Sequence, residues 1–150
     1  MRTRIKTLRL LQDLLIDYDY YNGSMIRVID QGKDWAVNDK LSYGNWLDQI
    51  RSFEVLKLEG LESIQNITSQ FKKHKIKNVH AFYNQKSGFS FKWHSDNIQV
   101  LLVILKGRKR LEIKNKVFNL RVGDAVIIPK GHKHRAWSTK GTWALSIGLE

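Results

Sequence analysis

The chain has 150 residues, which is enough for one domain with a buried hydrophobic core. It contains no cysteine, so disulfide scaffolds, thiolate metal sites and cysteine nucleophiles are excluded. No apolar run is long enough to cross a bilayer. The Leu-rich stretch after the basic start is interrupted by Arg9, Gln12 and Asp13, so it makes a poor secretory signal. We therefore expect a cytoplasmic protein with no membrane partner.

The net charge of +12 is distributed unevenly along the chain. Residues 1–70 carry nine Lys and Arg against ten Asp and Glu, whereas residues 71–150 carry seventeen against four. The strongly basic C-terminal half suggests a polyanionic binding partner, such as nucleic acid, the ribosome or an acidic protein. The alternative is a solvated basic surface that keeps the protein in solution, and net charge alone does not decide between the two.

The first 24 residues are expected to form a helical appendage, and residues 25–150 a jelly-roll domain. Leucine and isoleucine recur at helical spacing over residues 3–17, and a Tyr-, Asn- and Gly-containing break follows at 18–24. Such a helix covers the core or packs across a homodimer interface, with binding to a membrane surface as the alternative. A strand is predicted at residues 25–29.

Helices and strands are both expected in the middle of the chain, and strands alone after it. Asn45 is a candidate N-cap of a short helix, residues 53–58 read as a strand, and the apolar positions of 61–71 fit an amphipathic helix. From residue 78 onward, runs rich in Val, Ile, Phe and Trp alternate with glycines. The strands predicted there lie near residues 78–84, 90–95, 98–105, 108–114, 116–121, 124–128, 134–138 and 142–149. About eight short strands close naturally into a mainly β fold, a double-stranded β-helix or jelly roll with N-terminal helices.

A His-x-Asp motif, His94 and Asp96, lies at the end of the predicted strand near residues 90–95. Residues two apart on a strand share a face, so both side chains are expected to point inward and provide two corners of a metal site. The third corner must come from another strand, and His132 or His134 follows the Gly-Asp…Pro-x-Gly turn that begins at Gly123. Two His and one carboxylate leave three adjacent positions open, as in non-haem Fe(II) oxygenases.

Lys109 is the second unusual residue. It shares its parity with the apolar Leu111 and Ile113 in the predicted strand 108–114, so its ammonium is expected to point inward. A buried ammonium is costly unless it meets an anion, which a ligand carboxylate could supply. The alternative is that the side chain extends to the mouth of the barrel. The neighbouring Arg108 and Arg110 face outward, as a solvated edge or as a docking strip for a partner.

The sequence resembles the cupin superfamily over roughly residues 78–150. The second cupin motif, Gly-(five)-Pro-x-Gly-x-x-His, is matched by Gly123, Pro129, Gly131 and His134. In the first motif, which begins at Gly88, Asp96 stands in place of the usual second His. This replacement is similar to the JmjC-type 2-oxoglutarate oxygenases, and the likeness is closest to their ribosomal-oxygenase branch.

The resemblance implies a function and a set of site residues. His94, Asp96 and His134 would be catalytic ligands of Fe(II), with His132 as the competitor for the third position. The lysine that binds 2-oxoglutarate in the family falls thirteen residues after the Asp, which is Lys109 here. Asn84, at the relatives' Thr position, and Ser146 would hydrogen-bond the cosubstrate, or else they are ordinary core polar groups.

The expected activity is therefore an Fe(II)- and 2-oxoglutarate-dependent dioxygenase that hydroxylates a protein side chain. Dioxygen is the co-substrate, and the basic half of the chain suggests a ribosomal or RNA-associated protein as substrate. One alternative is a metal-binding cupin of another class, an isomerase or a cosubstrate-free dioxygenase. The other is a non-enzymatic module that binds nucleic acid through its basic strands.

Overall fold

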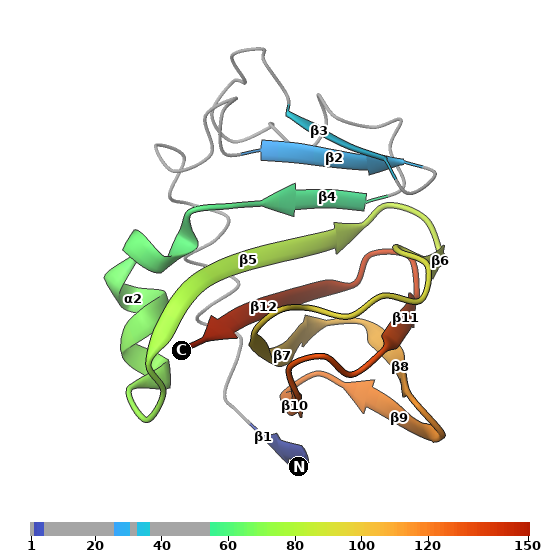
Figure 1. The fold of residues 1–150 in the computed structure, drawn as a ribbon. Helices are drawn as coiled ribbons and strands as arrows, with labels where there is room; N and C mark the ends of the chain where they lie inside the picture. Colours follow the sequence, from blue (N-terminus) through green and yellow to red (C-terminus); the bar gives the residue numbers. More distant parts are fainter. Residues whose placement is uncertain (1, 5–25, 31–32, 37–54) are drawn as a thin grey trace.

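The computed structural model describes residues 2–4, 26–30, 33–36 and 55–150. These residues form twelve strands in two sheets that face each other as a jelly roll (Figure 1). The larger sheet contains, in spatial order, β1 (Arg2–Arg4), β10 (Asp124–Ile128), β7 (Gln99–Lys106), β12 (Trp143–Leu149), β5 (Ile76–Asn84), β4 (Val55–Leu58), β2 (Ile26–Asp30) and β3 (Lys33–Ala36). The smaller sheet contains β6 (Gly88–Phe89), β11 (His134–Ser138), β8 (Arg108–Ile113) and β9 (Lys116–Arg121).

All of the strand pairs in both sheets are antiparallel. Alternating burial along the strands explains why the sheets pack face to face. In β8, for example, Lys109, Leu111 and Ile113 are buried, whereas Arg108 and Arg110 are exposed. The mainly β jelly roll predicted from the sequence is thus confirmed.

Two apolar clusters stabilise the larger sheet, one on each face. Between the sheets, Leu102, Ile104, Leu111 and Val126 belong to one buried apolar cluster. On the opposite face, a helical segment packs against β5 and its neighbours through residues such as Leu61 and Ile67. Burying a Leu or Ile side chain contributes about 1.5–3 kcal/mol, so this second cluster anchors the helical segment firmly.

The helical segment differs from the single amphipathic helix predicted over residues 61–71. It consists of a 3-10 turn at Leu61–Ser63, helix α2 (Gln65–Thr68) and a second 3-10 turn at Ser69–Phe71. Ile64 interrupts it with an extended backbone, although its side chain is buried like those of Leu61 and Ile67. The apolar spacing was therefore correct for burial, but the local backbone did not follow one continuous helix.

Two further predictions at the N-terminal end have different outcomes. Residues 3 and 4, expected to begin a helix, instead belong to β1, which pairs with β10. The rest of that predicted helix, the break at 18–24, the boundary near residue 24 and the short helix at Asn45 lie outside the described residues. In the described ranges, no helix combines the length and the apolar character that a membrane span requires.

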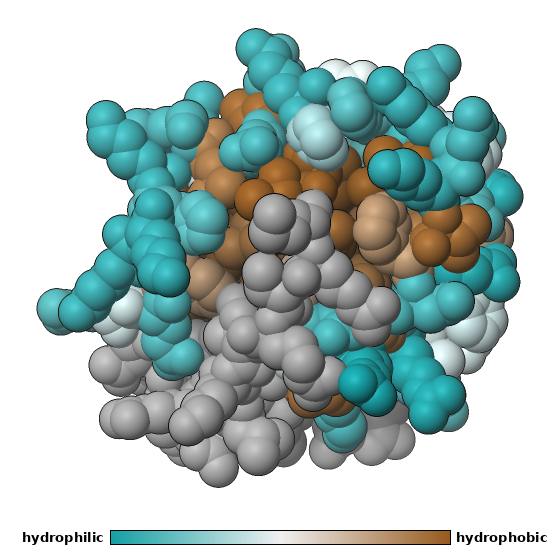
Figure 2. All heavy atoms as spheres, turned by 90° about the horizontal axis from the view of Figure 1, so that it is seen from below, coloured by the Kyte–Doolittle hydropathy of each residue, from teal (hydrophilic) through white to brown (hydrophobic). Residues whose placement is uncertain are grey.

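The space-filling view shows the end of the molecule that lies lowest in Figure 1 (Figure 2). Apolar surface gathers in the middle of this face, and hydrophilic side chains surround it above and on both sides.

Candidate metal centre and cosubstrate cavity

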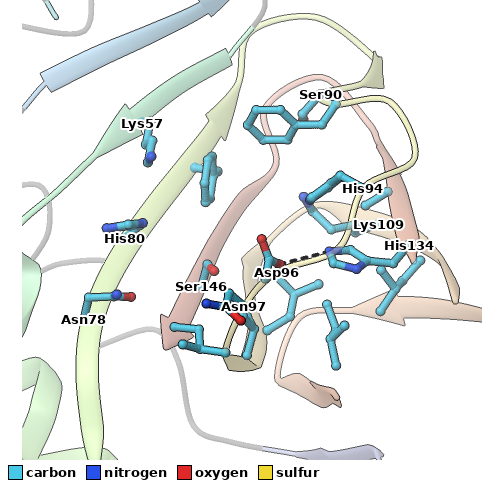
Figure 3. Close-up of a pocket in the computed structure, with 18 residues that line it drawn as sticks. Lys57, Asn78, His80, Ser90, His94, Asp96, Asn97, Lys109, His134 and Ser146 are labelled. Atoms are coloured by element: carbon cyan, nitrogen blue, oxygen red, sulfur yellow. Dashed lines mark ion pairs between the residues drawn. The ribbon is translucent and has the colours of Figure 1, made fainter. Parts of the chain in front are cut away.

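A cavity of about 420 Å³ lies between the two sheets, a volume typical of small-molecule sites. Side chains of β5 and β12 form one wall, and side chains of β8 and β11 belong to the other (Figure 3). Leu102, Leu111 and Ile128 from the inner apolar cluster complete its lining. A cavity with an apolar base and converging polar groups is the arrangement expected of a binding or catalytic site.

Three of the predicted ligands come together in this cavity. One potential ligand atom from each of His94, Asp96 and His134 lies within 4.8 Å of the other two. His134 Nε2 is 3.4 Å from Asp96 Oδ2, and the two imidazole ring centroids are 4.3 Å apart. Two imidazoles and one carboxylate form a donor set that suits Fe(II), and the spacing fits a single ion bound among them.

Backbone pairing explains why the two distant segments meet. His94 and His134 form an isolated antiparallel bridge, in which each backbone N–H donates to the other residue's carbonyl oxygen (3.1 and 2.8 Å). The Gly131 N–H donates to the Asp96 carbonyl oxygen at 3.0 Å. Both the His-x-Asp segment and the turn before β11 are therefore fixed by main-chain hydrogen bonds.

The two histidines are oriented in the same way by the chain that precedes them. His94 Nδ1 lies 2.8 Å from the Lys92 carbonyl oxygen, and His134 Nδ1 lies 2.9 Å from the His132 carbonyl oxygen. A carbonyl oxygen only accepts hydrogen bonds, so in each ring Nδ1 carries the proton. Each Nε2 is then available as a metal ligand, with the ring held in place by a second-shell carbonyl.

The charge states of the cluster favour a bound cation. The hydrogen bond from His134 lowers the pKa of Asp96, and this exceeds the opposing effect of burial. Burial by itself lowers the pKa of His134, but the hydrogen bond to Asp96, the His132 carbonyl and the Asp96 charge together raise it above its usual value. The space between Nε2 and the carboxylate therefore favours positive charge, whether a proton or a metal ion.

Lys109 lines the same cavity from β8, and only 6% of its surface is exposed. Burial lowers the pKa of this ammonium to about 8. Within the described part of the chain, no carboxylate forms an ion pair with it. The inward direction predicted from the strand parity is thus observed, and a ligand carboxylate could supply the counter-charge that the described residues do not.

Of the other predicted site residues, some line the cavity and others do not. Ser146 of β12 lines the cavity, opposite His80 in the register with β5. Asn84 is buried behind the lining, where its Nδ2 donates to Ser90 Oγ at 3.3 Å. Its Oδ1 has no hydrogen-bond partner in the described chain. The side chain of His132 does not belong to the three-residue cluster, so the geometry favours His134 at the third corner.

Several lining residues were not singled out from the sequence. Lys57 of β4 and Asn78 of β5 reach the cavity opposite the three clustered side chains, and Asn97 lies next to Asp96 (Figure 3). Lys57 Nζ is 3.1 Å from Glu59 Oε1, and its charge also lowers the pKa of Asp96. The alternation of Asn78 with buried Val79 in β5 is the one signal that could have identified this wall.

Two local predictions near the site were wrong. Residues 90–95 do not form a strand, because only the single bridge at His94 pairs there. His94 and Asp96 therefore meet through hydrogen bonds with the turn before β11 rather than through strand alternation. Trp93 directly precedes a candidate ligand in the sequence, and strand alternation predicts that its ring packs in the core; in the structure the ring is 44% exposed and does not line the cavity.

Comparisons with known proteins agree with this architecture. A sequence profile of the AraC-like ligand binding domain matches residues 78–147. The ribosomal oxygenase YcfD from Escherichia coli, in complex with cobalt and succinic acid, has a TM-score of 0.67 at 18% identity. The same protein in complex with cobalt and 2-oxoglutarate has a TM-score of 0.62, also at 18% identity.

In both cases the similarity covers 92% of this chain and 43% of YcfD, so the chain spans less than half the length of that protein. KdgF from Halomonas sp. has a TM-score of 0.50 at 11% identity and covers 64% of this chain and 78% of its own. A search of curated proteins finds none that matches the sequence. At these identities the likeness concerns the fold, and the fold of this chain is that of the cupins.

Proposed function

We propose that this protein is an Fe(II)- and 2-oxoglutarate-dependent oxygenase that hydroxylates a protein side chain. The observation that carries the proposal is the convergence of His94, Asp96 and His134 in one cavity with the buried ammonium of Lys109. The donor set suits Fe(II), and the ammonium suits the far carboxylate of a dicarboxylic acid. That YcfD was solved with cobalt and 2-oxoglutarate is consistent with this assignment.

Each proposed residue has a distinct task in the reaction. His94 and His134 hold the metal through Nε2, and Asp96 contributes a carboxylate that neutralises part of its charge. Lys109 pairs with the cosubstrate carboxylate farthest from the metal, while Ser146 and, behind Ser90, Asn84 complete its polar surroundings. When bound, Fe(II) and 2-oxoglutarate activate dioxygen, so that one oxygen atom hydroxylates the substrate C–H and the other enters succinate as carbon dioxide leaves.

The aromatic side chains of the cavity would shield the reaction from water. Phe91 packs edge-on to Phe82, with ring centroids 6.0 Å apart, and its ring centroid is 5.5 Å from that of His94. These rings place apolar surface on one side of the proposed metal site, which would limit side reactions of the oxidant. Lys57 and His80 lie on the same wall as Phe82, facing the clustered ligands, and we place the approach of a substrate side chain along this wall. The basic half of the chain favours a ribosomal or RNA-associated protein as that substrate.

The direct test is turnover of 2-oxoglutarate by the purified chain with Fe(II) and ascorbate under air. We expect succinate to form in the wild type and to be absent in Asp96→Ala, with metal content measured on the same samples. Loss of a ligand should weaken metal binding by at least about a hundredfold. Ser95→Ala is the matched control, because Ser95 is exposed and lies between two ligands without belonging to the cluster.

The alternative is a metal-binding cupin that needs no cosubstrate. The lowered pKa of Lys109, about 8, is the observation that favours this alternative, because such an amine can act as an acid or base near neutral pH. Metal binding without any succinate, even with candidate ribosomal peptides added, would overturn the oxygenase proposal in favour of this class. Absence of both metal binding and succinate would overturn the metal centre itself.

A further inference from the structure

The outer face of the smaller sheet, on the side away from the cavity, is unusually apolar for an exposed surface. Phe89 of β6 is 38% exposed, Trp93 is 44% exposed and Val117 of β9 is 57% exposed. Trp137 of β11 is directly opposite Phe89 in the strand register and is half-buried. Large exposed aromatic side chains on one sheet face indicate an interaction surface rather than a packing need.

Arginines are interleaved with these rings. The Arg135 guanidinium carbon is 4.3 Å from the Phe89 ring centroid and 4.8 Å from that of Trp93, so it lies close to both rings. The Arg110 guanidinium carbon is 6.0 Å from the Trp137 ring centroid. These contacts hold the rings in place while their exposed sides stay open to solvent.

The remaining charges on this face are not balanced by acids. Arg108 and Arg121 are directly opposite each other on β8 and β9, although like charges in that position repel. Within the described residues neither has an ion-pair partner, and the one acidic side chain of this face, Glu112, is already paired with Arg135 and Arg110. An anion bound between Arg108 and Arg121 would relieve the repulsion.

We propose that this outer face, formed by β6, β11, β8, β9 and Trp93, binds single-stranded RNA. Bases would stack on the exposed sides of Phe89, Trp93 and Trp137, and phosphates would contact Arg108 and Arg121. Stacked rings with flanking cations are how sheet surfaces bind single strands, whose bases are free to stack. The exposed Asn119 amide, opposite Arg110 in the register, can donate to or accept from a ribose 2′-hydroxyl. The site is separate from the cavity, so this inference does not depend on the proposed oxygenase activity.

Binding is measured by fluorescence anisotropy with the full chain and a labelled RNA of about 12 nucleotides, over a series of salt concentrations. The double variant Phe89→Ala/Trp93→Ala should bind at least about tenfold more weakly, because each lost stacking platform has about that effect. Arg108→Ala/Arg121→Ala should also bind more weakly, and the slope of log affinity against log salt should fall by about 1.4, because two phosphate contacts are lost.

The matched control is Lys72→Ala/Lys73→Ala, which removes the same charge from exposed positions outside this face. It should leave RNA binding nearly unchanged. Because Arg108 and Arg121 repel each other, their replacement should not lower the melting temperature, whereas a purely structural role would lower it. The same arginine variant should keep wild-type 2-oxoglutarate turnover, and Asp96→Ala should keep wild-type RNA binding.

Three outcomes would overturn the proposal. Equal affinity for duplex RNA would exclude stacking, because duplex bases are already stacked on each other. Equal loss of affinity in the Lys72/Lys73 control would indicate bulk charge rather than this face. Displacement of RNA by a poly-glutamate peptide, with no effect of the aromatic variants, would indicate an acidic protein partner instead.

Discussion

At the scale of single residues, Lys109 is the side chain whose burial lowers the stability of the fold while its charge serves the proposed function. Its ammonium is buried, and no carboxylate in the described chain forms an ion pair with it. The fall of its pKa from 10.5 to about 8 corresponds to about 3 kcal/mol at most in favour of the neutral amine. A side chain that costs stability in this way is expected to be kept for what it binds.

We therefore expect Lys109→Met to unfold at a higher denaturant concentration than the wild type at pH 7. The gain should be about 1–3 kcal/mol, because the buried charge is removed and an apolar chain of similar length fills its place. Lys106→Met is the control, since Lys106 is exposed and should change stability by less than about 0.5 kcal/mol. A lower stability of Lys109→Met in urea unfolding would show that the ammonium has a stabilising partner.

The same residue predicts how stability depends on pH. The folded chain releases the Lys109 proton near pH 8, whereas the unfolded chain holds it until about 10.5. Between these two pH values the unfolded state binds more protons than the folded state. As the pH increases through this range, the free energy of unfolding of the wild type should therefore rise relative to that of Lys109→Met. Below pH 8 the difference between the two proteins should be constant and largest. Parallel pH profiles across the whole range would contradict the lowered pKa.

Binding of 2-oxoglutarate should have the opposite pH dependence. The protonated ammonium pairs with a carboxylate, so the metal-loaded protein should bind the dicarboxylic acid most tightly below pH 8 and progressively more weakly above it. Calorimetric titration of wild type and Lys109→Met across this range measures the effect. The variant should bind weakly and with little change between pH 7 and pH 9. Wild-type affinity in the variant would remove Lys109 from the cosubstrate site.

At the scale of elements, the joint between β7 and β8 is the most constrained turn near the site. The chain crosses from the larger to the smaller sheet at Gly107, whose φ is +80°. A Cβ there would lie 2.8 Å from the backbone Cα of Thr142, and the Arg108 N–H donates to the hydroxyls of Thr139 and Thr142 at 3.2 Å. This joint sets the position of Lys109 two residues later.

Gly107→Ala should therefore destabilise the fold by about 2–5 kcal/mol, combining left-handed backbone strain with steric overlap. Gly141→Ala is the matched control, because Gly141 has a φ of +84° but open space where the Cβ would lie. Its cost should be about 1–2 kcal/mol, from the backbone alone. Equal losses for the two variants in urea unfolding would mean that contact with Thr142 does not constrain the turn.

At the scale of the whole molecule, the metal cluster joins segments that are far apart in the sequence. The loop between β6 and β7 carries His94 and Asp96, and the first residue of β11 is His134. A ligand that binds only the folded chain stabilises it, by about 2.7 kcal/mol at a hundred times its Kd. Co(II) should therefore raise the melting temperature, and Asp96→Ala should abolish this rise. A rise of equal size in Asp96→Ala would place the metal elsewhere.

Much of this architecture could be predicted because it follows from local periodicity. Alternating apolar residues identified most strands from residue 78 onward, and strand parity alone directed Lys109 inward. The spacing of glycines, Pro129 and His134 predicted that the turn before β11 would meet the His-x-Asp segment, and the two do lie together. Their role in binding metal and 2-oxoglutarate stays a prediction for the experiments above.

Other features depended on contacts that no local pattern reports. Residues 90–95 have strand-like composition but lack a continuous neighbour to pair with, so only His94 forms a bridge. Asn84 continues the inward parity of β5, yet Ser90 covers it and separates it from the cavity. The rings and arginines of the outer face come from several strands and one loop, and they become one surface only after the sheet forms.

The amino-acid order by itself determined which residues face inward and outward, because the pleat of a strand fixes that alternation residue by residue. Only the tertiary structure decided which inward residues share one cavity, because that depends on strand register and on main-chain bonds between distant segments. Lys57 and Asn78 face the clustered His and Asp side chains for this reason: alternation in β5 can place Asn78 on the inward face, but it cannot say which side chains lie across the cavity.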